Sequence, residues 1–128
     1  MTTILVAADA KWVRDQVRTA FTAPDMRVVE VTRGQDVREA FAREHPDLVV
    51  LDLNIGNMGG VAVALDLRLE ESAGRLERAR ILLLLDRDAD KFIAKRTDVD
   101  AMLVKPVDAG ILRRCAKQIL ETPQATSA

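Results

Sequence analysis

The chain has 128 residues, of which 48% are hydrophobic and 30% charged, and its 19 Lys and Arg almost balance its 20 Asp and Glu. This length predicts one domain with a substantial core, and the charge balance argues against a dedicated nucleic-acid binder, which needs clustered basic residues. The single cysteine, Cys115, has no partner for an internal disulfide, which fits a reducing compartment. No stretch reads as a signal peptide or membrane span, so a cytoplasmic location is expected.

Short apolar runs alternate along the chain with amphipathic stretches. Runs without polar alternation are typical of strands that are buried on both faces of a parallel sheet. A polar tail with small side chains follows the last amphipathic stretch, and we expect it to be disordered. The predictions are therefore one domain over residues 2–120 and a tail over 121–128, with strands at 4–8, 27–31, 48–51, 81–85 and 101–104.

Five stretches with helical periodicity follow these strands. The first ends near Pro24 and the second before Pro46, because a residue that precedes proline avoids the helical conformation. Asp108 is placed to cap the fifth helix. Five strand–helix units in strict alternation predict a doubly wound α/β fold. The apolar positions expected to define the helices are Val13, Val17, Ala20 and Phe21; Val37, Ala40 and Phe41; Val61, Ala64, Leu65 and Leu69; Phe92 and Ile93; and Ile111, Leu112, Cys115, Ile119 and Leu120.

Charged residues follow three of the predicted strands. Asp9 follows the first strand, Asp52 ends the third, and Lys105 follows the fifth. Because the carboxyl ends of parallel strands meet at one edge of a sheet, these side chains should lie close together. Carboxylates suit Mg²⁺, a carboxylate beside that ion can attack a phosphoryl group, and a lysine can contact the transferred phosphate. The plainer alternative is that Asp52 is only a polar residue at a strand end.

Three motifs, in this order, resemble bacterial response-regulator receiver domains. Residues 46–54 (PDLVVLDLN) resemble the third strand and phosphorylation site of that family, and Met58 and Gly60 match its following loop. Residues 104–106 (VKP) resemble the lysine–proline pair at the end of its fifth strand. Each motif alone is weakly specific, whereas the three together, spread over residues 2–120, are a strong indication.

The resemblance implies a five-stranded parallel sheet of order 2-1-3-4-5 with five helices. It also implies phosphotransfer from a histidine kinase to Asp52, with Mg²⁺ held by Asp9, Asp52 and the backbone carbonyl of Asn54. Lys105 would contact the phosphoryl group, and its bond to Pro106 is commonly cis in the family.

Four places depart from the pattern that the family shows, and one is the loop after Asp52, with Gly56 where proline is usual and Gly59 where an acid is common. Ala8 stands in place of the first of two acids, and Met102 in place of an aromatic residue on the fifth strand. The Ser or Thr that usually ends the fourth strand is replaced by Leu85, or by Asp86 if the register shifts by one residue. Losing that hydroxyl removes a hydrogen bond to the phosphoryl group, and the free energy of such a bond is comparable to that of a typical allosteric coupling. We therefore expect the transfer chemistry to be possible and the usual conformational switch to be impaired.

A cluster of three acids and the single tryptophan each have a structural interpretation as well as a functional one. The acids Asp86, Asp88 and Asp90 could supply a compensating carboxylate at the site, but a solvated loop is the expected role. Trp12 borders the first helix, where packing in the core or at its rim is expected.

The leading hypothesis is a stand-alone receiver domain without an output domain, phosphorylated on Asp52 and signalling through protein contacts. It is not an enzyme beyond self-catalysed phosphotransfer and dephosphorylation. Its partners would be a histidine kinase or phosphotransfer protein and a downstream protein, with no direct nucleic acid and no membrane. The alternative is a phosphorylation-independent pseudo-receiver that acts as a protein-binding module. A nucleotide- or flavin-binding enzyme is disfavoured, because no glycine-rich phosphate loop follows any strand.

Residues 91–117 carry seven basic and three acidic residues. This segment resembles the face through which receivers bind partners, and a homodimer through it is possible in this interpretation. A basic face that is simply solvated is the alternative.

Overall fold

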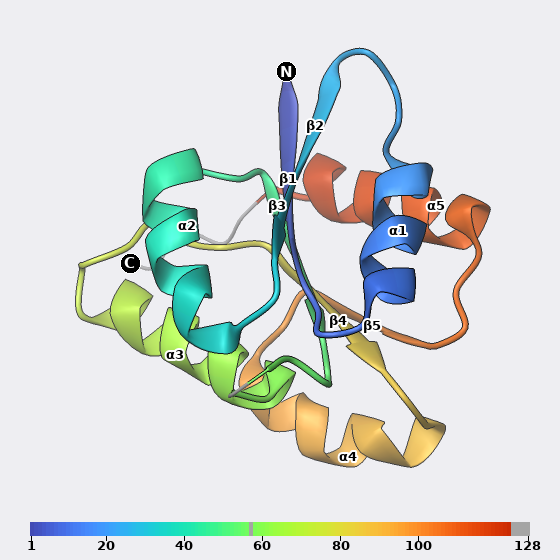
Figure 1. The fold of residues 1–128 in the computed structure, drawn as a ribbon. Coiled ribbons are helices and arrows are strands. Elements are labelled where there is room, and N and C mark those ends of the chain that lie inside the picture. Colours follow the sequence, from blue (N-terminus) through green and yellow to red (C-terminus); the bar gives the residue numbers. More distant parts are fainter. Residues whose placement is uncertain (57, 124–128) are drawn as a thin grey trace.

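The computed structural model describes residues 1–56 and 58–123. Within them, five parallel strands form one open sheet, and five α-helices cover its two faces (Figure 1). The strands lie in the order β2-β1-β3-β4-β5, so the predicted fold class and strand order are confirmed. In chain order the elements are β1 (Thr2–Ala7), α1 (Lys11–Ala20), β2 (Met26–Val31), α2 (Val37–Glu44), β3 (Leu48–Asp52), α3 (Gly60–Ser72), β4 (Ile81–Leu85), α4 (Lys91–Ala94), β5 (Ala101–Val104) and α5 (Ala109–Glu121).

Two apolar layers flank the sheet. Helices α1 and α5 cover one face, and α2, α3 and α4 cover the other (Figure 1). Side chains along each strand alternate between the two layers, which the strict period of two in an extended chain requires. In β3, for example, Val49 and Leu51 pack toward α2 and α3, whereas Leu48 and Val50 pack toward α1 and α5. The central strands therefore contribute apolar side chains to both layers, as the sequence predicted, and β3 ends in the polar residue Asp52.

The predicted inward face of α3 is partly wrong. Leu65 and Leu69 are exposed, and Val63 and Leu67 are buried in their place. The apolar residues of α3 recur at nearly every second position, so the helix is apolar on several sides and periodicity does not select one. The short helix α4 likewise exposes Phe92 and Ile93.

The predictions at the chain's C-terminal end are close to the structure. The Asp108 side chain caps α5 by accepting a hydrogen bond from the backbone N–H of Ile111 at 2.8 Å, as expected. Helix α5 includes Glu121, so the predicted tail starts one residue inside the helix. Residues 124–128 of that tail lie outside the described residues.

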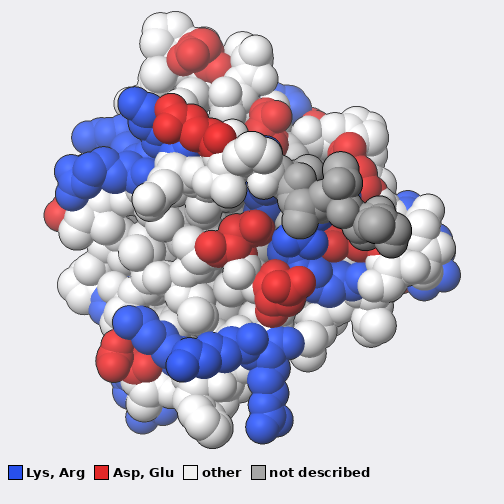
Figure 2. All heavy atoms as spheres, turned by 180° about the vertical axis from the view of Figure 1, so that it is seen from behind, with Lys and Arg blue, Asp and Glu red and all other residues white. Residues whose placement is uncertain are grey.

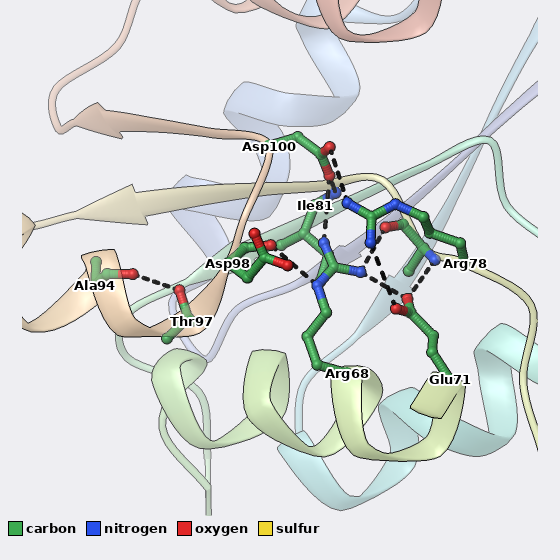
Figure 3. A network of polar contacts seen from close by, with 9 residues as sticks. Arg68, Glu71, Arg78, Ile81, Ala94, Thr97, Asp98 and Asp100 are labelled. Atoms are coloured by element: carbon green, nitrogen blue, oxygen red, sulfur yellow. Dashed lines mark hydrogen bonds and ion pairs between the residues drawn. The ribbon is translucent and has the colours of Figure 1, made fainter. Parts of the chain in front are cut away.

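A polar cluster joins α3 to the beginnings of β4 and β5 (Figure 3). The Arg68 guanidinium donates to Glu71 Oε1 at 2.6 Å and to the Asp98 carbonyl at 3.0 Å, and it lies 3.4 Å from Asp100 Oδ2. Asp100 in turn accepts from the backbone N–H of Ile81 at 2.7 Å. This cluster lies where the strands begin, at the opposite end of the sheet from the predicted site.

Within the part of the chain that the structure describes, none of the helices is long and apolar enough to cross a membrane.

Candidate functional site

The candidate site lies where β3 ends. The Asp52 side chain points toward the layer of α1 and α5, on the same side of the sheet as Val50 two residues earlier. Asp52 is only 1% exposed. The register pairs Asp52 with Leu84 on the next strand, and Leu85 with Val104 on the strand beyond. Asp86 and Lys105, one residue further on, therefore lie level with each other just beyond the edge of the sheet.

The structure brings Asp52 and Lys105 together, as the spacing of the motifs predicted. Lys105 Nζ donates a hydrogen bond to Asp52 Oδ1, and the Lys105 side chain is 8% exposed. The peptide bond between Lys105 and Pro106 is cis, as the family resemblance implied. A buried carboxylate that is bound to an ammonium is suited to accept a negatively charged group, because the ammonium can stabilise the added charge.

Asp86 also belongs to this site, which is the role that the sequence left as the alternative to a solvated loop, although its side chain is still 39% exposed. Its Oδ1 lies 2.8 Å from Lys105 Nζ, and its Oδ2 accepts from Asn54 Nδ2 at 2.6 Å. Leu85 is fully buried and packs in the opposite layer with Leu83, because side chains alternate along β4. Of the two residues considered for the end of the fourth strand, Asp86 is the one that reaches the lysine.

The charges of this cluster shift one another's pKa values. Burial raises the pKa of Asp52, and the hydrogen bond from Lys105 opposes that shift, while the neighbouring charge of Asp86 adds to it. Burial by itself lowers the pKa of Lys105, but hydrogen bonds to the two carboxylates outweigh it and raise that pKa. The hydrogen bond from Lys105 lowers the pKa of Asp86. The ammonium is thus held in its charged form between two carboxylates.

The predicted metal ligands lie at the same edge and offer oxygen donors. Asp9 is exposed just after β1, and its backbone N–H donates to the Asn54 carbonyl at 3.1 Å. A carbonyl oxygen has two lone pairs, so Asn54 keeps one for a cation. Among the described residues, no three acidic, His or Cys side chains are grouped as a metal cluster. A cation here would rest on two carboxylates, a carbonyl and water, which is the usual environment of Mg²⁺.

The position of the missing acid is closed. Ala8 is fully buried in the layer of α1 and α5, and the pairing of Ala7 with Leu51 places Ala8 level with Asp52. Arg14 from α1 donates to the carbonyls of Ala8 and Asp9, at 2.9 and 2.7 Å. Sequence reasoning did not identify Arg14, because a contact to backbone carbonyls leaves no motif.

Trp12 is at the rim of the site. Lys105 Nζ lies 5.8 Å from the centroid of the Trp12 ring, within the range of a cation–π contact. The ring is more than half exposed. Packing in the core or at its rim was expected for Trp12, whereas the contact with Lys105 was not, because it joins α1 to the segment after β5.

Comparison with known proteins places these residues in a family context. The family profile described as response regulator receiver domain matches residues 4–117. The KDP operon transcriptional regulatory protein KdpE of Escherichia coli (strain K12) is 31% identical over 129 residues, which cover 100% of this chain and 55% of that protein. The transcriptional regulatory protein RstA of the same organism is 29% identical and covers 98% of this chain and 52% of its own length. The chain thus spans about half the length of these curated relatives.

Solved structures agree with the sequence relatives. The BeF3-activated N-terminal receiver domain of Klebsiella pneumoniae RstA superposes with a TM-score of 0.81 at 26% identity, covering 94% of this chain and 100% of that domain. A putative response regulator from Chloroflexus aurantiacus gives a TM-score of 0.83 at 19% identity, covering 94% of this chain and 98% of the other, which shows the shared fold.

Proposed function

The chain belongs to the response regulator receiver domain family of two-component signalling, and on that premise we propose that Asp52 is its phosphate-accepting residue. The observation that carries the proposal is the buried Asp52 carboxylate with the Lys105 ammonium bound to it at the carboxyl edge of the sheet. A histidine kinase or a phosphotransfer protein donates the phosphoryl group, and the domain signals onward through protein contacts.

The reaction uses the side chains at that edge directly. An oxygen of the Asp52 carboxylate attacks the phosphorus of the donor phosphohistidine and forms an acyl phosphate. The P–N bond breaks, and its electron pair returns to the imidazole nitrogen of the donor. Lys105 stays within reach of the phosphoryl oxygens and stabilises their charge. Apart from this transfer and the hydrolysis of its product, we propose no enzymatic activity.

Magnesium is the cofactor that this donor set fits. Asp9, Asp52 and the carbonyl of Asn54 are the groups that would hold it. When bound, Mg²⁺ neutralises part of the charge on the phosphoryl oxygens.

The missing acid gives a prediction about this metal. Replacing Ala8 with aspartate should tighten Mg²⁺ binding about tenfold, because the new carboxylate lies level with Asp52 and anchors bound water. Without metal, the same buried charge should lower the free energy of unfolding by about 1–3 kcal/mol. A Mg²⁺ titration followed by the fluorescence of Trp12, the single tryptophan, measures the affinity. Equal affinity in both proteins would show that another acid already compensates for Ala8.

The test of the proposed function is labelling with acetyl phosphate and Mg²⁺, followed by the intact mass. The wild type should gain one phosphoryl group, and Asp52→Asn should gain none, because an amide is not a nucleophile of this kind. The control is Asp88→Asn, which removes an exposed acid that pairs with Lys91 outside the site. If Asp52→Asn is labelled as well as the wild type, Asp52 is not the acceptor.

A second candidate function is a protein-binding module that works without phosphorylation. The bond between Asp86 and Lys105 favours it, since the ammonium is already engaged by acids in the unmodified protein. An unlabelled wild type in the same experiment would select this candidate.

The surface around α4 is the one we propose for partner contacts, including a second copy of the chain. Phe92 is 74% exposed and Ile93 58% exposed, and Lys91, Lys95 and Arg96 are their neighbours in sequence. Figure 2 shows Lys and Arg beside Asp and Glu on the rear of the molecule, with uncharged surface between them. The exposed apolar side chains of Phe92 and Ile93 favour a protein partner over nucleic acid or an anionic membrane. The proposed kinase partner also implies a cytoplasmic location.

A further inference from the structure

The Lys105 ammonium has two carboxylate partners, of which only Asp52 is needed to receive a phosphoryl group. The second is Asp86, whose Oδ1 lies 2.8 Å from Lys105 Nζ. The other oxygen of Asp86 is also engaged, because Asn54 Nδ2 donates to it at 2.6 Å. Asn54 and Lys105 thus fix the position of the Asp86 side chain beside the ammonium.

Little of the lysine is left for a third anion. An ammonium has three N–H donors, and two of those on Lys105 are directed at Asp52 and Asp86. The ring of Trp12, 5.8 Å from Nζ, covers the ammonium further. A phosphoryl group on Asp52 needs donors from this same ammonium, and it brings additional negative charge toward the carboxylate of Asp86. The acid and the phosphoryl group therefore oppose each other at Lys105.

We infer that Asp86 is an intramolecular competitor for Lys105, and that it must leave the ammonium before Asp52 can be phosphorylated efficiently. The inference rests on the proposed function of Asp52 and names the residue that regulates it. In this role Asp86 is a positioning residue, because it acts on the reaction only through the lysine. While the Asp86 carboxylate is bound to Lys105, the ammonium is not available to an incoming phosphoryl group. A partner that draws Asp86 away from Lys105 would make Asp52 a better acceptor.

A magnesium ligand is the other role that an acid could have here. The contacts of Asp86 favour the competitor role, since each of its oxygens already accepts from a nitrogen donor. Binding a cation would require Asp86 to give up the lysine or the asparagine. The two roles predict opposite effects of removing the acid, so one experiment separates them.

The experiment compares the wild type with Asp86→Ser and Asp86→Asn in acetyl phosphate and Mg²⁺, with the donor below saturation. The matched control is Asp88→Ser, which removes the same charge from the same loop, where Asp88 pairs with Lys91 at 2.9 Å. We expect Asp86→Ser to be labelled about tenfold faster than the wild type, the factor for one charge-assisted hydrogen bond that no longer competes. Asp86→Asn should also be faster, and Asp88→Ser should match the wild type.

Magnesium affinity, measured separately by Trp12 fluorescence without donor, should be the same in Asp86→Ser and the wild type. Thermal unfolding checks that each variant is folded, and Asp86→Asn preserves the shape of the side chain if the serine variant is unstable. Faster labelling of the Asp86 variants than of the wild type supports the inference. A labelled wild type with Asp86 variants that are no faster, or that bind Mg²⁺ more weakly, overturns the inference and leaves the proposed function standing. Labelling of no protein in the set overturns both.

Discussion

Replacing Arg68 with methionine should lower the free energy of unfolding by about 3 kcal/mol, because it removes one partner from a buried cluster of charges. The Arg68 side chain is 12% exposed, and it donates to Glu71 Oε1 at 2.6 Å and to the carbonyl of Ala79 at 2.8 Å. It also donates to the carbonyl of Asp98, in the segment before β5 (Figure 3). Methionine fills a similar volume but donates nothing, so these acceptors lose a partner inside the protein.

Denaturant unfolding of the variant measures this loss, with Arg38→Met as the matched control. Arg38 also binds a carboxylate of α3, that of Asp66, but its side chain is 51% exposed. Its replacement should cost less than about 1 kcal/mol, as is usual for exposed ion pairs. Equal losses in the two variants would mean that burial does not strengthen the Arg68 cluster. Labelling of Asp52 should survive in Arg68→Met below its unfolding temperature, because the cluster and the site lie at opposite ends of the strands.

Most of the fold could be predicted because its signals are local. Runs such as Ile81–Leu85 are apolar at every position, and only a strand covered on both faces requires that. Proline and the capping residue Asp108 mark helix ends through their own backbone chemistry. The inward face of α3 was not predictable in this way, since Leu65 and Leu69 are as apolar as the residues that the helix buries. Which side of such a helix meets the sheet is decided by packing of the whole domain.

The candidate site was predictable to the extent that it follows strand ends. Asp52 and Lys105 meet because parallel strands deliver their carboxyl ends to one edge. The contacts of Asp86 and Trp12 with Lys105 depend instead on the path of two loops, which sequence periodicity does not describe. The sequence predicted that Asp86 lies in a solvated loop, because an acid in a loop is usually solvated. The choice between Leu85 and Asp86 required the register of β4 against its neighbours.

That register gives the last prediction, which concerns a hydroxyl introduced at position 85. Leu85→Ser should lower the free energy of unfolding by about 4 kcal/mol, since emptying a buried leucine site alone costs about 2.7–5 kcal/mol and the hydroxyl adds desolvation. Leu85 is fully buried in the layer that contains Leu83 and Ala94. Its side chain points away from Asp52, so the serine should not speed labelling in protein that remains folded.

Asp86→Ser, one residue further along the chain, is the internal control for this prediction. Its side chain is exposed at the edge of the site, and we expect it to change stability by less than about 1 kcal/mol. Urea unfolding of the two serine variants, followed by labelling under folding conditions, makes the comparison. A loss below about 1.5 kcal/mol in Leu85→Ser, together with faster labelling, would mean that the end of β4 can turn to present position 85 to the phosphoryl group. We expect the opposite pattern, in which only the serine at position 86 speeds labelling. Side chains alternate along β4, so position 85 faces the core and position 86 faces Lys105.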